Sequence, residues 1–185
     1  MGRDFVASIT SRKHAGGGRH GDGKGKLILS VAQLPTKAGL RSFYSPRRKI
    51  LMIAEGSDAS IVAHEIGHSL EEFGEVHELV SGFLHHRTKG ESLQALNDVL
   101  GTDRYEDWET GRGDNFARAF LGRLMGLNKK QAAGKAFYAG KHYEGASEIL
   151  SMGIELLYDD PIGFAQRDPE WFDFTLGILR GDLLP

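Results

Sequence analysis

The sequence predicts an α+β fold, in which a small N-terminal β-sheet is followed by a mostly helical region. Short runs of branched apolar residues bounded by turn formers, which are typical of strands, all lie before residue 55. After Gly56 the apolar residues recur instead at the spacing that one face of a helix requires. Strands that precede helices, rather than alternate with them, indicate the α+β class.

Three segments have the composition of strands. LILSV (27–31) and KILMIA (49–54) are the clearest, and DFVASIT (4–10) is a third candidate. The stretch 14–26 holds six of the 25 glycines and is expected to be a flexible loop. It lacks the Gly-Lys-Ser/Thr ending of a phosphate-binding loop. Residues 35–48, with two prolines and a glycine, are expected to form a second loop.

The first helix is expected to begin after Ser57 or Asp58, either of which can cap its N-terminus, and to stop at Gly74. The polar segment 101–113 is expected to be a loop. Further helical stretches are predicted at residues 75–87, 91–100, 114–127, 144–158 and 169–180. We expect residues 1–185 to form one domain, because 185 residues suit a single core.

The composition excludes several classes of function. The formal net charge of −2 argues against broad electrostatic capture of nucleic acid or of an anionic membrane. No apolar run approaches the roughly 18 residues that span a bilayer, and the N-terminal residues lack the apolar region of a signal peptide. We therefore expect a cytoplasmic protein. The absence of cysteine excludes disulfides, cysteine nucleophiles and thiolate zinc sites, including the deformylase type.

VAHEIGHSLEE (62–72) carries the strongest chemical signal. His64 and His68 are four residues apart, so both imidazoles can reach one zinc ion from the same helix face at about 2.0–2.1 Å. Glu65 lies where it can accept a proton from a water molecule on the metal. This pattern is typical of zinc peptidases. Gly67 inside the motif costs about 1 kcal/mol of helix stability relative to alanine, which indicates close packing there.

A catalytic zinc site needs a third protein ligand. The metzincin extension of the motif is absent. Glu148 is the preferred ligand, because it lies on an otherwise apolar helix face, where a carboxylate is costly unless it is paired or metal-bound. Glu155 on the same face and Glu144 are alternatives. Weaker candidates are Glu71, which is better suited to support a histidine ligand, and Asp103, His77, His85 and His86.

Together the motifs resemble the gluzincin class of zinc metallopeptidases. HEIGH is followed, after a helical interval, by tyrosines and then by SEILSMGIE. More narrowly, this order resembles the catalytic domain of anthrax lethal factor and the Pro-Pro endopeptidases, in which a glutamate on a later helix completes the site. The resemblance implies a zincin-like fold, zinc ligands at His64, His68 and Glu148, and Glu65 as general base.

The same resemblance implies a group that stabilises the oxyanion. In those peptidases it is a tyrosine seven residues before the glutamate, a position that Lys141 takes in this chain. Tyr143 is the preferred substitute, Tyr138 is an alternative, and His142 is a further candidate for the same role.

The downstream stretch DPIGFAQRDPEWFDFTLGILRG resembles a C-terminal block in metallopeptidase-like proteins of tailed bacteriophages and prophages, which implies association with a virion as an alternative location. The resemblance to these families extends over roughly residues 49–181. Asp168 and the aromatic residues after it, including Trp171, are expected to form a capped helix and part of the core rather than a substrate pocket.

The sequence therefore predicts a zinc metalloendopeptidase that acts on a peptide or protein, with strand 49–54 as the edge that pairs with an extended substrate. The alternative is a non-catalytic zincin-like module of a phage particle or toxin, in which zinc mainly holds the fold. Glu65 favours the enzyme, because a structural site needs ligands but no base. A nucleic-acid-associated protein that uses the basic segment 12–26 is disfavoured by the net charge.

Overall fold

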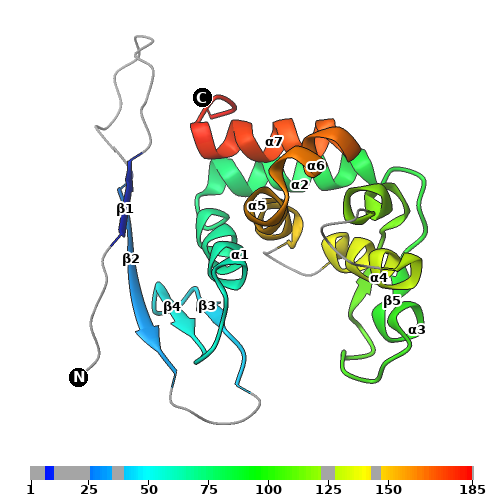
Figure 1. Cartoon of the computed structure of the whole chain (residues 1–185), viewed down its shortest axis with the longest axis horizontal. Coiled ribbons are helices and arrows are strands. Elements are labelled where there is room, and N and C mark those ends of the chain that lie inside the picture. Colours follow the sequence, from blue (N-terminus) through cyan, green and yellow to red (C-terminus); the bar gives the residue numbers. More distant parts are fainter. Residues whose placement is uncertain (1–6, 11–25, 35–39, 122–127, 143–146, 185) are drawn as a thin grey trace.

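The computed structural model describes residues 7–10, 26–34, 40–121, 128–142 and 147–184. It has the predicted mixed architecture, with a small sheet on one side and a mostly helical body on the other (Figure 1). Within these residues, no helix is both long enough and apolar enough to cross a membrane.

The N-terminal sheet has four strands in the order β1-β2-β4-β3. β1 (Ala7–Thr10) runs antiparallel to β2 (Lys26–Gln33), which pairs in parallel with β4 (Ile50–Ile53). β3 (Phe43–Ser45) pairs antiparallel with β4. The three predicted strands are confirmed, but β3 lies inside the region 35–48 that was expected to be a loop. β3 has only three residues, which is too short for the alternation of apolar and polar side chains by which a strand is recognised in a sequence.

This topology corrects the predicted substrate edge. β4 is flanked by β2 on one side and by β3 on the other, so its backbone groups are not free to pair with a peptide. β3 is instead the outer strand of the sheet on the side of the first helix. Of the glycine-rich loop predicted at 14–26, residues 14–25 lie outside the described part of the chain.

The first helix, α1 (Ala59–Leu70), carries the histidine motif. Asp58 caps it as predicted, because its Oδ1 accepts the N–H of Ile61 at 3.0 Å. The helix ends at Leu70, before the expected stop at Gly74, which instead begins α2 (Gly74–Arg87). α1 lies between the sheet and α5 (Ile149–Asp159), so the motif faces the middle of the molecule (Figure 1).

After α2, the described residues form helices and the loops between them, apart from a second, small sheet. Its strands have the order β5-β6-β7 and two residues each: β5 (Gln94–Ala95), β6 (Thr110–Gly111) and β7 (Lys141–His142). The remaining helices are α3 (Leu96–Leu100), the 3-10 helix η1 (Asp114–Phe120), α4 (Lys129–Ala139), α6 (Pro161–Arg167) and α7 (Pro169–Arg180).

Several predicted boundaries in this region are wrong. The helix expected at 91–100 is limited to α3, because β5 precedes it, and the loop expected at 101–113 contains β6. The stretch 114–127 begins as a 3-10 helix, and residues 122–127 lie outside the described part. α4 was not predicted, although Asn128 and Gln131 cap each other reciprocally at its start. The predicted helix 169–180 is confirmed as α7.

α1 and α5 approach each other closely at Gly67. A Cβ atom at this position would lie 2.4 Å from the Cα of Ser151 and 2.8 Å from its backbone nitrogen. Backbone atoms cannot move aside as the end of a side chain can, so only glycine allows this approach. The close packing that Gly67 indicated in the sequence is therefore confirmed, and it fixes the distance between the two helices that carry the site.

The hydrophobic core is centred on Trp171 of α7, which is fully buried. Its ring lies edge-on to Phe116, Phe120 and Phe164. Its indole N–H donates a hydrogen bond to the carbonyl of Ile149 at 3.1 Å, which ties α7 to the start of α5. The expected role of this C-terminal block as a capped helix and core is confirmed.

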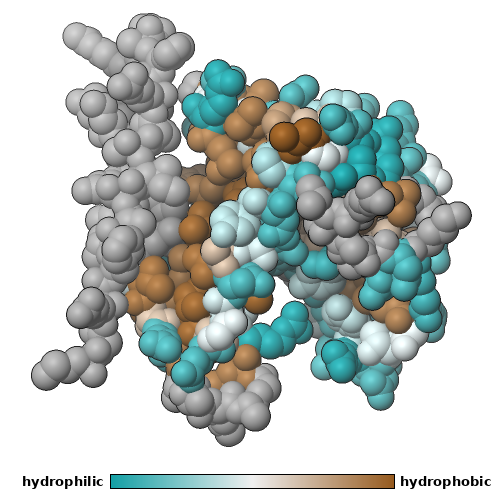
Figure 2. Space-filling view, in the orientation of Figure 1, coloured by the Kyte–Doolittle hydropathy of each residue, from teal (hydrophilic) through white to brown (hydrophobic). Residues whose placement is uncertain are grey.

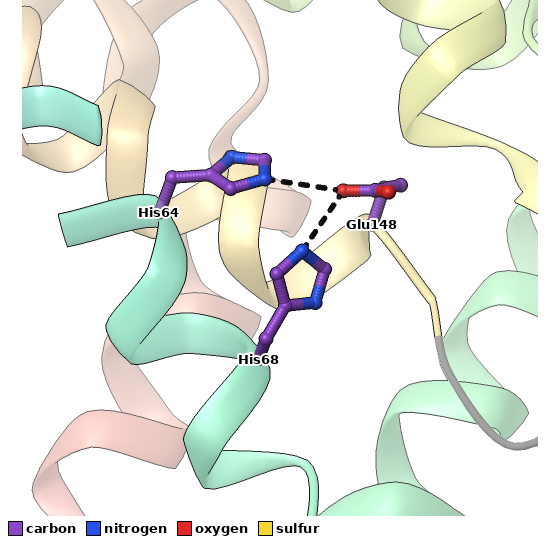
Figure 3. A group of neighbouring side chains, drawn as sticks. All are labelled: His64, His68 and Glu148. Atoms are coloured by element: carbon purple, nitrogen blue, oxygen red, sulfur yellow. Dashed lines mark ion pairs between the residues drawn. The ribbon is translucent and has the colours of Figure 1, made fainter. Parts of the chain in front are cut away.

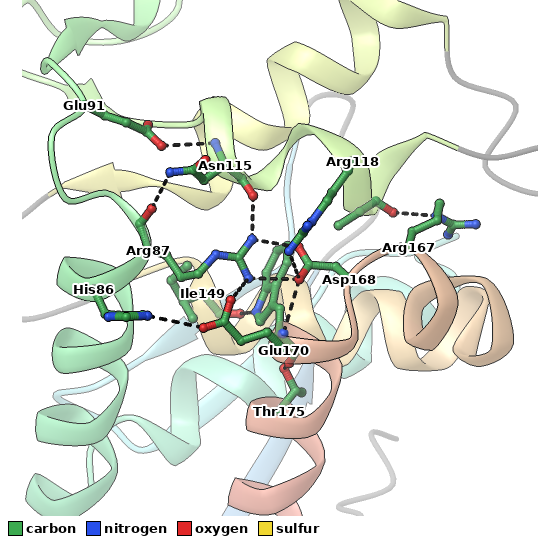
Figure 4. A network of polar contacts seen from close by, with 12 residues as sticks. His86, Arg87, Glu91, Asn115, Arg118, Ile149, Arg167, Asp168, Glu170 and Thr175 are labelled. Carbon is green, nitrogen blue, oxygen red and sulfur yellow. Dashed lines mark hydrogen bonds and ion pairs between the residues drawn. The ribbon is translucent and has the colours of Figure 1, made fainter.

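A buried ion pair joins the end of α2 to the start of α7 (Figure 4). Arg87 donates to both carboxylate oxygens of Asp168, at 2.9 and 2.8 Å, and also to the carbonyl of Asn115. Asp168 in turn caps α7 by accepting the N–H of Trp171 at 3.3 Å. Each buried donor and acceptor of this pair is thus matched within the protein.

Candidate metal centre

Three of the predicted site residues converge between α1 and α5 (Figure 3). His64 and His68 project from successive turns of α1, and Glu148 lies at the N-cap position of α5. The Oε2 atom of Glu148 is 3.2 Å from Nε2 of His64 and 3.3 Å from Nε2 of His68. One ligand atom from each residue lies within 4.8 Å of the other two, an arrangement that can hold a metal ion.

The spacing of these atoms fits zinc. Ligand atoms at about 2.0–2.2 Å from a tetrahedral zinc ion lie about 3.3–3.6 Å from one another. The measured separations from Glu148 to the two imidazoles, 3.2 and 3.3 Å, are close to such an edge. The donor set of two imidazole nitrogens and one carboxylate oxygen is also one that zinc accepts, with room for a further ligand.

The pKa shifts of Glu148 and His64 indicate that the site favours a positive charge beside the buried carboxylate. Glu148 is 2% exposed, and although burial alone would raise its pKa, hydrogen bonds from His64 and His68 hold that pKa far below its ordinary range. Burial opposes the charged form of His64, but the carboxylates of Glu148 and Glu155 outweigh it and raise the pKa of His64 to about 9. The two carboxylates therefore favour a positive charge at His64.

Glu155 supports His64 from the other side of the ring. Its Oε2 is 3.1 Å from Nδ1 of His64, and its Oε1 accepts a hydrogen bond from Lys135 at 2.9 Å. A carboxylate at Nδ1 fixes the tautomer that leaves Nε2 free to bind a metal. Glu155, an alternative ligand in the sequence, is therefore placed to orient a ligand.

Glu65 lies on the same helix but contacts the sheet. Its Oε2 accepts the backbone N–H of Tyr44, in β3, at 2.8 Å, and its side chain lines the same cleft as His64 and His68. Glu65 is 7% exposed, and this burial raises its pKa above the ordinary value, against the opposing charges of the two histidines. The hydrogen bond to β3 fixes the carboxylate beside the candidate metal ligands.

Glu71 anchors the segment that carries Glu148. Its two oxygens accept the backbone N–H of Ser147 at 3.0 Å and the hydroxyl of the same residue at 2.9 Å. Burial raises the pKa of Glu71 to about 7. The sequence suggested that Glu71 supports a histidine, and this expectation is wrong. The carboxylate of Glu71 instead holds Ser147, the residue before Glu148.

A phenol hydroxyl that can serve as an oxyanion donor is that of Tyr138 in α4, which lines the cleft beside His64 and His68. Burial, followed by the charge of Glu148 and a hydrogen bond to it, raises the phenol pKa of Tyr138 far above its ordinary value. Tyr143 lies outside the described residues, and His142 is described only as part of β7, without its side chain. The ammonium group of Lys141 lies 5.6 Å from the ring centres of both Tyr105 and Tyr138.

The weaker candidate ligands do not join the cluster. Glu144 lies outside the described residues, and within the described part the cluster contains His64, His68 and Glu148 alone. His86 contacts Glu170 of α7 instead, at 3.4 Å (Figure 4). Asp103, His77 and His85 are likewise outside the cluster.

The site opens into a cleft of about 1120 Å³. One wall comes from β3 and the residues before it, and the other comes from α1 and α4. Figure 2 shows a notch in the molecular surface between the side of the sheet and the α3–α4 side of the helical body. Its volume exceeds that of most pockets for small ligands, which measure about 300–1,000 Å³, and suits a chain-like substrate.

Models of protein families, curated protein sequences and solved structures were all compared with the chain, and none of them matches it.

Proposed function

We propose that this protein is a zinc-dependent metallopeptidase with a zincin-like site, in which His64, His68 and Glu148 hold the ion. The observation that carries the proposal is the convergence of two imidazoles and a buried carboxylate beside a cleft that Glu65 also lines. When bound, zinc supplies a Lewis acid and lowers the pKa of its water ligand toward about 7.

We assign the proton transfers to Glu65. Its carboxylate takes a proton from the attacking water and returns it to the leaving amine. Two features support this role: the hydrogen bond from Tyr44 holds the side chain beside the ligands, and burial raises its pKa toward the pH at which it must both accept and release a proton. β3, the outer strand that carries Tyr44, replaces β4 as the edge for an extended substrate.

We assign the oxyanion to Tyr138. Because its pKa is raised by burial and by Glu148, the phenol keeps its proton at neutral pH and can donate a hydrogen bond to a developing negative charge. Tyr143 and His142 keep this role as alternatives.

The rival function is a non-catalytic metal-binding module of a phage particle or toxin. One observation favours it: the ligands come from α1 and α5, which pack together through Gly67, so a bound ion would also brace the core. The contact between Glu65 and Tyr44 gives that glutamate a structural use as well. In this case zinc contributes to folding, and the cleft cleaves nothing.

Glu65→Gln separates the two functions. Glutamine keeps the size of the side chain but cannot accept the proton, so cleavage of a peptide library should fall at least about a hundredfold while the zinc content stays at one ion per chain. Glu75→Gln, a change at an exposed position of α2, is the matched control and should leave cleavage unchanged. Equal cleavage by Glu65→Gln and the wild type rejects this mechanism, and no cleavage by either favours the structural module.

A further inference from the structure

A second cavity adjoins the metal centre, with a volume of about 480 Å³. Residues of α3 and α4 form most of its wall. Arg41, Lys135 and Tyr138 line both this cavity and the large cleft, so the two spaces are contiguous. Tyr138 also interacts with the ligand Glu148, which places the entrance of the second cavity one side chain away from the candidate metal.

The two spaces differ in charge. The large cleft has four carboxylates in its wall, those of Glu65, Glu71, Glu72 and Glu155, beside three cationic side chains, of which it shares Arg41 and Lys135 with the second cavity. The described wall of the second cavity has no carboxylate but three cationic side chains, from Arg41, Lys130 and Lys135. Among the described residues, Lys135 is paired with Glu155, and no ion pair links Arg41 or Lys130 to a carboxylate.

The other groups of the second cavity also suit an anion. The hydroxyls of Tyr105 and Tyr138 add hydrogen-bond donors to its wall. Burial raises the pKa of both phenols, whereas the charge of Arg41 acts on each in the opposite direction, so Arg41 lies near the two rings. Val99 and Leu100 provide an apolar surface for the methylene groups of an acidic side chain.

We propose that this second cavity is a subsite for a carboxylate of the peptide substrate, with Arg41 and Lys130 as the residues that select it. Arg41 can bind a carboxylate through two parallel N–H groups, and Lys130 adds a point charge. The proposal rests on the proposed peptide substrate and adds a preference to it: an acidic residue close to the scissile bond.

Binding to a protein that does not cleave tests this preference separately from catalysis. The probes are acetylated and amidated octapeptides of alanine and glycine with one glutamate, moved through each position, and the isosteric glutamine peptides as controls. The same glutamine peptides with a free C-terminus distinguish a terminal carboxylate from a side-chain one. Affinities are measured by isothermal titration calorimetry on zinc-loaded Glu65→Gln protein.

We expect the best glutamate peptide to bind on the order of tenfold more tightly than its glutamine partner, as for a hydrogen bond to a charged group. Arg41→Gln should remove most of this preference and Lys130→Gln a smaller part. Lys89→Gln, an exposed change outside both cavities, should remove none.

Equal binding of glutamate and glutamine peptides, or no binding of either, overturns the proposal. So does a preference that survives Arg41→Gln and Lys130→Gln together. Selective binding without cleavage by the wild type keeps the carboxylate subsite and rejects the peptidase. Cleavage without any charge preference keeps the peptidase and rejects the subsite.

Discussion

Among the described residues, two buried polar clusters are built in opposite ways. In the first, Arg87 and Asp168, 81 residues apart, satisfy each other through two parallel hydrogen bonds. In the second, His64 and His68 both direct Nε2 at the same oxygen of Glu148. The first cluster contains a permanent cation, Arg87, whereas the two histidines of the second cluster are cationic only when protonated. A buried carboxylate on which two histidines converge is thus the feature that distinguishes the candidate site from the structural ion pair.

Removing the carboxylate of the second cluster should have the largest effect on metal binding. Glu148→Ala leaves two imidazoles, so zinc affinity should fall by more than the roughly 10–100-fold that the loss of an outer partner costs. Because the ion links α1 to α5, EDTA should lower the melting temperature of the wild type and hardly alter that of the variant. Competition with a zinc chelator measures the zinc affinity, and thermal melts with and without EDTA measure the melting temperatures. Unchanged zinc affinity in Glu148→Ala contradicts the ligand assignment.

Breaking the first cluster should affect stability alone. Arg87→Ala leaves Asp168 buried without its partner and should lower the free energy of unfolding by about 3–5 kcal/mol. Zinc stoichiometry should remain one per chain in the folded variant, because Arg87 is not among the residues that line the cleft. Denaturant titration and metal analysis test this pair of outcomes. A loss of zinc from the folded variant would show that the two clusters are coupled.

Gly67→Ala tests the contact on which the second cluster depends. The added methyl group would meet the backbone of Ser151, so α1 and α5 must separate, at a cost of about 1–3 kcal/mol. Separation also moves both histidines from Glu148, so we expect weaker zinc binding. Gly82→Ala, on α2, where a Cβ atom meets nothing within 4 Å, is the control and should be neutral or slightly stabilising. Equal stability of the two variants contradicts the close approach.

Glu155→Gln should have a smaller effect on the second cluster. His64 keeps a hydrogen-bond partner but loses the carboxylate that orients it, so zinc affinity should fall within the range of about 10–100-fold. Glu170→Gln, a change of an exposed carboxylate beside the first cluster, should leave zinc affinity unchanged. Isothermal titration with zinc compares the affinities of the two variants. If Glu155→Gln lost as much zinc affinity as Glu148→Ala, Glu155 would be a ligand rather than a partner of His64.

The pH dependence should differ between the metal-free and zinc-bound forms. In the metal-free protein, the raised pKa of His64, about 9, contributes stability that is fully present below the unfolded value of about 6.5 and is lost as the pH rises through 9. The lowered pKa of Glu148 contributes stability that is lost on acidification. Zinc needs the neutral imidazole, so its affinity should instead rise with pH up to about 9. Thermal melts from pH 5 to 10, with zinc and with EDTA, should show these opposite slopes.

The three residues of the candidate metal cluster could be predicted because their signals are local. The spacing of His64 and His68 and the cap at Asp58 can be read within a dozen residues, and Glu148 was identified by the cost of placing a carboxylate on an apolar helix face. Each of these signals comes from the spacing of residues along a helix or from the apolar residues around a carboxylate, and both can be read from the sequence.

What surrounds the ligands was not predictable, because it depends on contacts between distant segments. Glu71 accepts hydrogen bonds from Ser147, which lies 76 residues further along the chain, and no local pattern indicates that pairing. Tyr138 was only an alternative, because it lies ten residues before Glu148, whereas Tyr143 lies five before it. The helix α4 that carries Tyr138 was not predicted, because it buries small alanines, such as Ala132 and Ala136, that give a weak apolar period. β3 is too short to be recognised, so the substrate edge was assigned to β4.

The most direct test of the central claim is a crystal structure of the protein with one equivalent of zinc, with anomalous scattering recorded at the zinc absorption edge. The account predicts a single peak bound by Nε2 of His64, Nε2 of His68 and a carboxylate oxygen of Glu148, each within about 2.2 Å. A peak at other residues, a Glu148 carboxylate well outside that distance, or no peak in a zinc-supplied crystal would contradict it.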